Sequence, residues 1–134
     1  MENVVRILQK YDPNLIVVGS YSGRLHGVEV RVKDLDIVVT NLDVFSDDLP
    51  IDIFISKGLY NPGVRRASVT ILGYHVDIFE GNLVPEEKVT TINEIRTITV
   101  RGLVDYYFEL LSYSNNAYFQ DLLVGKISQY ENYI

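Results

Sequence analysis

Two aspartates with one residue between them open an apolar run. Asp34 and Asp36 flank Leu35, and the β-branched stretch 37–39 follows. In an extended strand, side chains two positions apart lie on the same face, so both carboxylates point one way while Leu35 points toward the core. Carboxylate oxygens so placed can hold one divalent cation or bridge two. Such a pair also occurs as a plain polar strand start, but its context here favours metal-assisted chemistry on phosphate groups.

That context is a Gly-Ser turn after the apolar run 15–18. Gly19 allows the backbone to approach a ligand closely, and the free N–H groups of a following helix start favour an anion. The Ser20 hydroxyl can donate to a phosphate oxygen, and Arg24 lies one turn further on. Each feature alone is typical of an ordinary turn. Together with the aspartate pair they predict a phosphate-binding turn.

A third carboxylate would complete the site, and two candidates compete for this role. Asp77 and Asp52 each lie between apolar neighbours within a predicted strand, where an aspartate is unfavourable unless something pairs with it. We favour Asp77, because its strand is one arm of a hairpin that can pair beside the strand of Asp34. Either aspartate can instead face solvent from an edge strand.

Hydrophobic periodicity and turn residues predict the elements that position these groups. The predicted strands are 15–18, 34–40, 51–55, 68–72 and 75–79, the last two forming a hairpin around Gly73-Tyr74, with a loop over 57–66. The predicted helices are 2–10, 21–26 and two helices after Thr91–Glu94, which has the spacing of a capping box. We expect an α+β fold with a mixed sheet, helices packed on one face and a short helical C-terminal end. Residues 1–134 are predicted to form a single domain, with a sheet core over 1–83 and a helical end over 84–134.

Composition limits the function further. The chain has 134 residues, 47% of them hydrophobic, a formal net charge of −6 and no cysteine. Disulfides and thiolate metal sites are therefore excluded, and a broad nucleic-acid surface is disfavoured because such surfaces are basic. No window of 18 apolar residues occurs, and the first residues do not form a signal peptide. We expect a cytoplasmic protein without a membrane span.

The motifs Val18-Gly19-Ser20, Asp34-Leu35-Asp36 and Val76-Asp77-Ile78 together resemble the DNA polymerase β-like nucleotidyltransferase superfamily. The resemblance implies that Asp34 and Asp36 bind two Mg²⁺ ions, with Mn²⁺ as a substitute. It implies that Asp77 binds the catalytic ion and lies near the attacking hydroxyl as its base. Gly19 and Ser20 would hold the β- and γ-phosphates of a nucleoside triphosphate.

The implied reaction transfers a nucleoside monophosphate to a hydroxyl of a small molecule, an RNA or a protein, and releases pyrophosphate. Members of the superfamily often carry a lysine on a helix after the sheet that contacts the triphosphate. Residues 101–113 contain no lysine; Lys126 on the helical end is one substitute, and Arg65 or Arg66 in the predicted loop is another. Tyrosines gathered in the helical end are typical of core and interface packing. They could also stack on a nucleobase or form a homodimer or partner-protein contact. The alternative is a catalytically weak or inactive protein of this fold, acting as an antitoxin or an interaction module.

Overall fold

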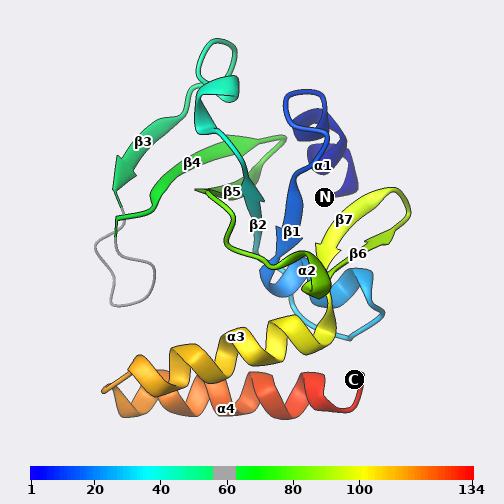
Figure 1. Cartoon of the computed structure of the whole chain (residues 1–134), viewed down its shortest axis with the longest axis vertical. Coiled ribbons are helices and arrows are strands. Elements are labelled where there is room, and N and C mark those ends of the chain that lie inside the picture. Colours follow the sequence, from blue (N-terminus) through cyan, green and yellow to red (C-terminus); the bar gives the residue numbers. More distant parts are fainter. Residues whose placement is uncertain (56–62) are drawn as a thin grey trace.

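The computed structural model describes residues 1–55 and 63–134, whose strands form one seven-stranded mixed sheet (Figure 1). The strands are β1 (Ile16–Val18), β2 (Asp34–Val39), β3 (Asp52–Ile55), β4 (Arg65–Ile71), β5 (Tyr74–Glu80), β6 (Val89–Ile92) and β7 (Ile95–Ile98). The helices are α1 (Glu2–Gln9), α2 (Gly19–Leu25), α3 (Val100–Tyr113) and α4 (Ala117–Glu131), with short 3-10 helices η1 (Leu42–Phe45) and η2 (Glu86–Lys88). The strand order is β3-β4-β5-β2-β1-β7-β6, in which β2–β5 and β1–β7 are parallel pairs and the others antiparallel.

One face of the sheet carries the larger hydrophobic cluster. The odd-numbered residues of β2 are buried there with the even-numbered apolar residues of β5 and with the apolar stripe of α1. Side chains alternate along a strand, so Leu35 and Ile37 enter this cluster while Asp34 and Asp36 face the opposite side. The predicted α+β class with a mixed sheet and C-terminal helices is confirmed, but the helices pack against both faces: α1 lies on this one, and α3 and α4 lie on the other.

A second cluster lies on the aspartate side of the sheet, where α3 and α4 run alongside each other at one end of the strands (Figure 1). Val18, which is paired with Asp36 and so shares its face, packs against this cluster. Tyr130 of α4 is almost fully buried and reaches back to Gly23 of α2. The C-terminal helices therefore pack against the chain around β1 and α2.

The predicted helical end over 84–134 is wrong in its first part, because residues 89–98 form the β6–β7 hairpin. Thr91–Glu94 is not a capping box: Asn93 and Glu94 both have positive φ, 51° and 65°, as a two-residue hairpin turn requires. The β-branched residues on either side favour strands over helix. The N-cap of α3 is Thr99, whose side chain accepts a hydrogen bond from Gly102 N at 3.0 Å.

Other boundaries differ by a few residues. Helix α2 begins at Gly19 and not at residue 21, so Gly19 and Ser20 are its first two residues. The β4–β5 turn is Leu72-Gly73 and not Gly73-Tyr74, with φ values of 50° and 82°. Strand β4 begins at Arg65, within the predicted loop 57–66, most of which lies outside the described residues. None of the helices in the described ranges combines the length and apolar character needed to cross a bilayer.

The contact between α2 and α4 gives a stability prediction. A Cβ at position 23 would lie 2.5 Å from Tyr130 Cε1 and 2.7 Å from its hydroxyl oxygen. Gly23→Ala should therefore lower the free energy of unfolding by about 1–3 kcal/mol, because overpacking outweighs the gain in helix propensity. Urea denaturation followed by circular dichroism measures this change.

Gly125→Ala is the matched control. Gly125 is also helical, but a Cβ there meets no atom within 4 Å, so alanine should stabilise the protein by about 0.5–1 kcal/mol. Equal effects of the two substitutions would show that the α2–α4 contact does not restrict the helix packing.

Candidate functional site

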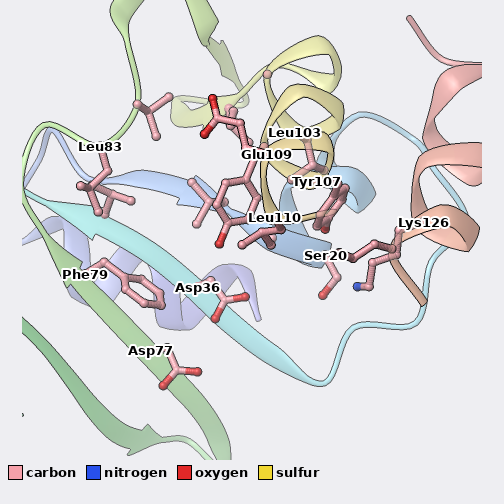
Figure 2. A pocket seen from close by; sticks show the side chains of 18 of the residues that line it. Ser20, Asp36, Asp77, Phe79, Leu83, Leu103, Tyr107, Glu109, Leu110 and Lys126 are labelled. Atoms are coloured by element: carbon pink, nitrogen blue, oxygen red, sulfur yellow. The ribbon is translucent and has the colours of Figure 1, made fainter. Parts of the chain in front are cut away.

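The parallel pairing of β2 and β5 brings two of the predicted carboxylates together. Asp36 is paired directly with Asp77, and Asp34 is paired with His75. Paired residues in neighbouring strands lie on the same face, so all three aspartates share the face opposite the larger hydrophobic cluster. Figure 2 shows the Asp36 and Asp77 carboxylates next to each other on adjacent strands, on the side of the pocket that α3 covers.

Asp52 does not compete for this position. It lies on the same face, because it is paired with Ser68 and Ser68 with Asp77. However, β4 separates β3 from β5, and Asp52 is exposed outside the pocket. Of the two candidates for a third carboxylate, Asp77 is thus the one next to Asp36.

The Gly-Ser turn lies against the aspartates because Val18 is paired with Asp36. Gly19 has φ 69°, in the left-handed region, and a Cβ there would collide with Asp36 Oδ2. Glycine is therefore required by both backbone conformation and space. Ser20 lines the pocket, and Figure 2 shows the Lys126 side chain extending from α4 toward it.

The pocket between this face and α3–α4 has a volume of about 1060 Å³, enough for a nucleotide-sized ligand. Among the described residues, five lysines and arginines line it but only four acidic residues do, although the sequence holds 12 of the former and 18 of the latter. The cations are Arg31, Lys33, Arg66, Lys88 and Lys126, and the acids are Asp34, Asp36, Asp77 and Glu109. An acidic chain thus concentrates positive charge around three carboxylates, which suits a metal-bound polyanion.

Arg24 does not join the site, contrary to the sequence expectation. It is exposed on α2, outside the pocket lining, and its guanidinium donates to the Val30 carbonyl at 2.7 Å. The helix begins two residues earlier than predicted, which changes the direction in which position 24 points. The location of Lys126 is compatible with the expected contact to a phosphate, whereas the location of Arg24 is not.

Asp36 carries the clearest electrostatic signal. Burial, and then the negative charges of Asp77 and Asp34, raise the pKa of Asp36 to about 6, while Arg66 and Lys126 act in the opposite direction. The ionised form is therefore held in an unfavourable environment. A divalent cation between these carboxylates would relieve the repulsion, and oxygen ligands of this kind suit Mg²⁺. The donor set fits the metal that the sequence implied.

Asp77 is engaged by protein donors. Its Oδ1 accepts from Ser68 Oγ at 2.9 Å, and the Arg66 guanidinium and His75 Nε2 approach it at 3.5 Å and 3.2 Å. Across residues 1–55 and 63–134, no three His, Asp or Glu side chains are arranged as a ready-made metal site. A cation held at this position would therefore require rearrangement of these carboxylates.

Several pocket residues were not singled out from the sequence. Arg31 and Lys33 come from the irregular segment before β2, and Glu109 comes from the side of α3 that faces the sheet. Tyr106, in contrast, is one of the tyrosines that the sequence gathers in the helical end; it lines the pocket, and burial and the charge of Asp36 raise its pKa. The alternation of charges over 28–33 was the available signal for the first two, but long-range packing decides the positions of the α3 residues.

No protein-family profile and no curated protein matches the sequence, but several solved structures share its fold. A candidate nucleotidyltransferase of Thermotoga maritima aligns with a TM-score of 0.61 at 21% identity, covering 81% of this chain and 85% of that one. The JHP933 protein of Helicobacter pylori aligns over 99% of this chain and 67% of its own, with a TM-score of 0.54 and 18% identity. An antigenic nucleotidyltransferase-like protein of Paracoccidioides brasiliensis aligns over 96% and 73%, with a TM-score of 0.54 and 12% identity.

The chain therefore has the nucleotidyltransferase fold that its motifs predicted. The agreement extends over most of the chain, including both the aspartate-bearing strands and the helical end.

The raised pKa of Asp36 gives a pH-dependent prediction. Because the folded-state pKa of about 6 exceeds the ordinary value of 3.8, this group contributes stability below pH 4 that is lost as the pH rises through 6. Asp36→Asn should therefore stabilise the metal-free protein at pH 8 by about 1–3 kcal/mol, with no gain at pH 4. Urea unfolding at the two pH values in EDTA measures the difference.

Asp52→Asn is the control, since it removes an exposed carboxylate from the same sheet face outside the pocket. Its effect should be within about 0.5 kcal/mol at both pH values. A D36N protein that is less stable than wild type at pH 8 would contradict the conclusion that burial and neighbouring charges destabilise the ionised form of Asp36.

Proposed function

We propose that this protein is a magnesium-dependent nucleotidyltransferase. It moves a nucleoside monophosphate from a nucleoside triphosphate to an acceptor hydroxyl and releases pyrophosphate. The observation that supports this most strongly is the register of β2 and β5, which aligns Asp36 with Asp77 beside the Gly19-Ser20 turn. These are the positions to which the resemblance of the sequence motifs assigns catalytic carboxylates and a phosphate-binding turn.

Asp34, Asp36 and Asp77 would hold the metal ions, with two Mg²⁺ or Mn²⁺ ions as the expected complement. Bound there, the ions would neutralise charge on the phosphates and on the attacking and leaving oxygens. Burial and the charges of Asp77 and Asp34 raise the pKa of Asp36, and this supports the role because a bound cation would favour the ionised carboxylate.

The chain's own residues would perform the remaining work. Gly19 and Ser20 would contact the β- and γ-phosphates at the start of α2, and Lys126 would supply a cation from α4. The acceptor oxygen attacks the α-phosphorus, and its new bond to phosphorus forms as the bond from phosphorus to the bridging oxygen breaks. Pyrophosphate leaves, and the acceptor proton passes to Asp77 as base.

The acceptor is a small molecule, an RNA segment or a protein, and the pocket favours a compact one. Its lining extends from the carboxylates to the end of α3 at Ser114 and Asn115, which leaves room beside a bound nucleotide. The net charge of −6 disfavours a long nucleic-acid acceptor. A cytoplasmic location would supply the nucleoside triphosphate.

A second candidate function is protein interaction through the helical end, with weak or no catalysis. Helix α4 exposes large apolar side chains outside the pocket, including Tyr118 at 75% exposure, Leu122 and Val124. Exposed apolar surface of this kind is typical of contact surfaces. A homodimer, or an antitoxin-like complex with a partner protein, would use it.

Ligand-induced stabilisation separates these functions. Addition of Mg²⁺ and a nucleoside triphosphate should raise the melting temperature of the wild type, because ligand binds only the folded state. At a ligand concentration a hundredfold above Kd, the stabilisation is about 2.7 kcal/mol. Asp36→Asn should abolish this ligand-dependent increase while the protein remains folded, as measured by differential scanning fluorimetry.

Asp52→Asn again serves as the control and should keep the wild-type increase. A wild-type protein that melts identically with and without Mg²⁺ and each of the four ribonucleoside triphosphates would leave the interaction function as the better explanation. Pyrophosphate release with candidate acceptors then measures turnover.

A further inference from the structure

Arg66 is a cationic residue of the sheet that lies next to the Asp77 carboxylate. It lies on β4 opposite Phe79 of β5, on the face that carries Asp36 and Asp77. Its guanidinium is 3.5 Å from Asp77 Oδ1, and the two side chains are only 29% and 15% exposed. Arg66 also counteracts the rise in the pKa of Asp36. In the ligand-free protein it is therefore a compensating charge within the proposed metal site.

The neighbours of Arg66 hold its side chain in position but leave part of its hydrogen-bonding capacity unused. Its guanidinium carbon lies 4.7 Å from the centre of the Phe79 ring and 5.2 Å from that of Phe54, so aromatic side chains from β5 and β3 both contact it. Its Nε is buried and is the single such side-chain atom in the described residues that lacks a hydrogen-bond partner. A guanidinium offers five N–H donors in a planar fork suited to phosphate, and much of this capacity is unused here.

We propose that Arg66 couples metal binding to nucleotide binding: its guanidinium neutralises Asp77 in the free protein and transfers to the triphosphate when a divalent cation binds Asp77. The inference rests on the proposed function, because it assumes that both ligands enter this pocket. Arg66 and the metal compete for the Asp77 carboxylate. Once displaced from Asp77, the guanidinium would have no anionic partner unless another anion takes the place of the carboxylate. The triphosphate is that anion.

This arrangement makes the two ligands mutually dependent. Metal alone must separate Arg66 from Asp77 and leave the guanidinium without an anionic partner, so its binding is weakened. Nucleotide bound together with the metal offers a new partner, so each ligand strengthens the binding of the other. Removal of Arg66 should therefore affect the two affinities in opposite directions, which loss of structure alone would not do.

The experiment measures Mn²⁺ binding and nucleotide binding separately by isothermal titration calorimetry. The nucleotide probe is an ATP analogue with a methylene bridge between the α- and β-phosphates, titrated with saturating Mn²⁺, so that no turnover occurs. For Arg66→Gln we expect Mn²⁺ alone to bind about three- to tenfold more tightly than in wild type. The analogue should bind about tenfold more weakly.

Arg65→Gln is the matched control, because Arg65 is the adjacent residue but points to the other face. It pairs with Asp43 at 2.7 Å and with Glu80 at 3.3 Å, outside the pocket. This variant removes the same unit of charge and should leave both affinities within about twofold of wild type. Arg66→Lys keeps the charge but lacks the guanidinium fork. It should weaken analogue binding in the same direction, and it provides the test if Arg66→Gln does not fold.

The outcomes separate the inference from the function on which it rests. Opposite changes in the two affinities of Arg66→Gln, or weaker analogue binding with unchanged Mn²⁺ binding in Arg66→Lys, support the coupling when Arg65→Gln shows neither. If wild type binds both ligands but the variants lose both together, or change neither, the coupling is refuted while the proposed function stands. If wild type binds neither Mn²⁺ nor the analogue, the proposed function fails and the coupling with it.

Discussion

The parallel pairing of β2 with β5 is the constraint on which the rest of the site depends. It places Asp36 directly opposite Asp77 and so forces two carboxylates into proximity on a partly buried face. Side chains alternate along a strand, so the burial of Leu35 and Ile37 in the core places Asp36 on the opposite face of the sheet. A register shift of one residue would bury the acids and expose the core residues, so hydrophobic burial itself maintains the charge repulsion.

The distribution of cations follows from this constraint. The chain as a whole is acidic, yet Lys126 from α4 and Arg66 from β4 both lower the electrostatic penalty on Asp36. Neither is adjacent to the aspartates in the sequence. Clustered charges of this kind make the folded protein less stable than neutral side chains would. Functional pockets often lower the stability of the proteins that contain them in this way. The glycine at position 19 belongs to the same compromise, because any side chain there would occupy the space of the Asp36 carboxylate.

Local patterns predicted which carboxylates lie together better than they predicted the start of the helical end. Strand periodicity correctly gave Asp34 and Asp36 a common face, and the hairpin argument correctly favoured Asp77 over Asp52 as the neighbour of Asp36. The β6–β7 hairpin was missed because Thr91–Glu94 fits the spacing of a capping box as well as the turn that it forms. Short-range rules cannot separate these alternatives when the deciding factor is pairing of β7 with β1.

Residues positioned by long-range packing were the least predictable part of the site. Arg24 was expected near phosphate from its distance along the chain, but it bonds to the Val30 carbonyl because α2 begins earlier than predicted. Lys126 reaches the pocket only because α4 packs against α3 and α2, which depends on Tyr130, Gly23 and the buried face of α3. Glu109 and Tyr106 depend on the same packing.

The contribution of α4 also has a consequence for how the molecule is made. Chains are synthesised from the N-terminus, and their earlier segments begin to fold first. The three pocket aspartates Asp34, Asp36 and Asp77 and the Gly-Ser turn precede residue 80, whereas Lys126 and Tyr130 come from α4. A nascent chain therefore contains the three pocket aspartates before Lys126 has been synthesised. The pocket acquires the charge of Lys126 only when α4 has been made and has packed against α3.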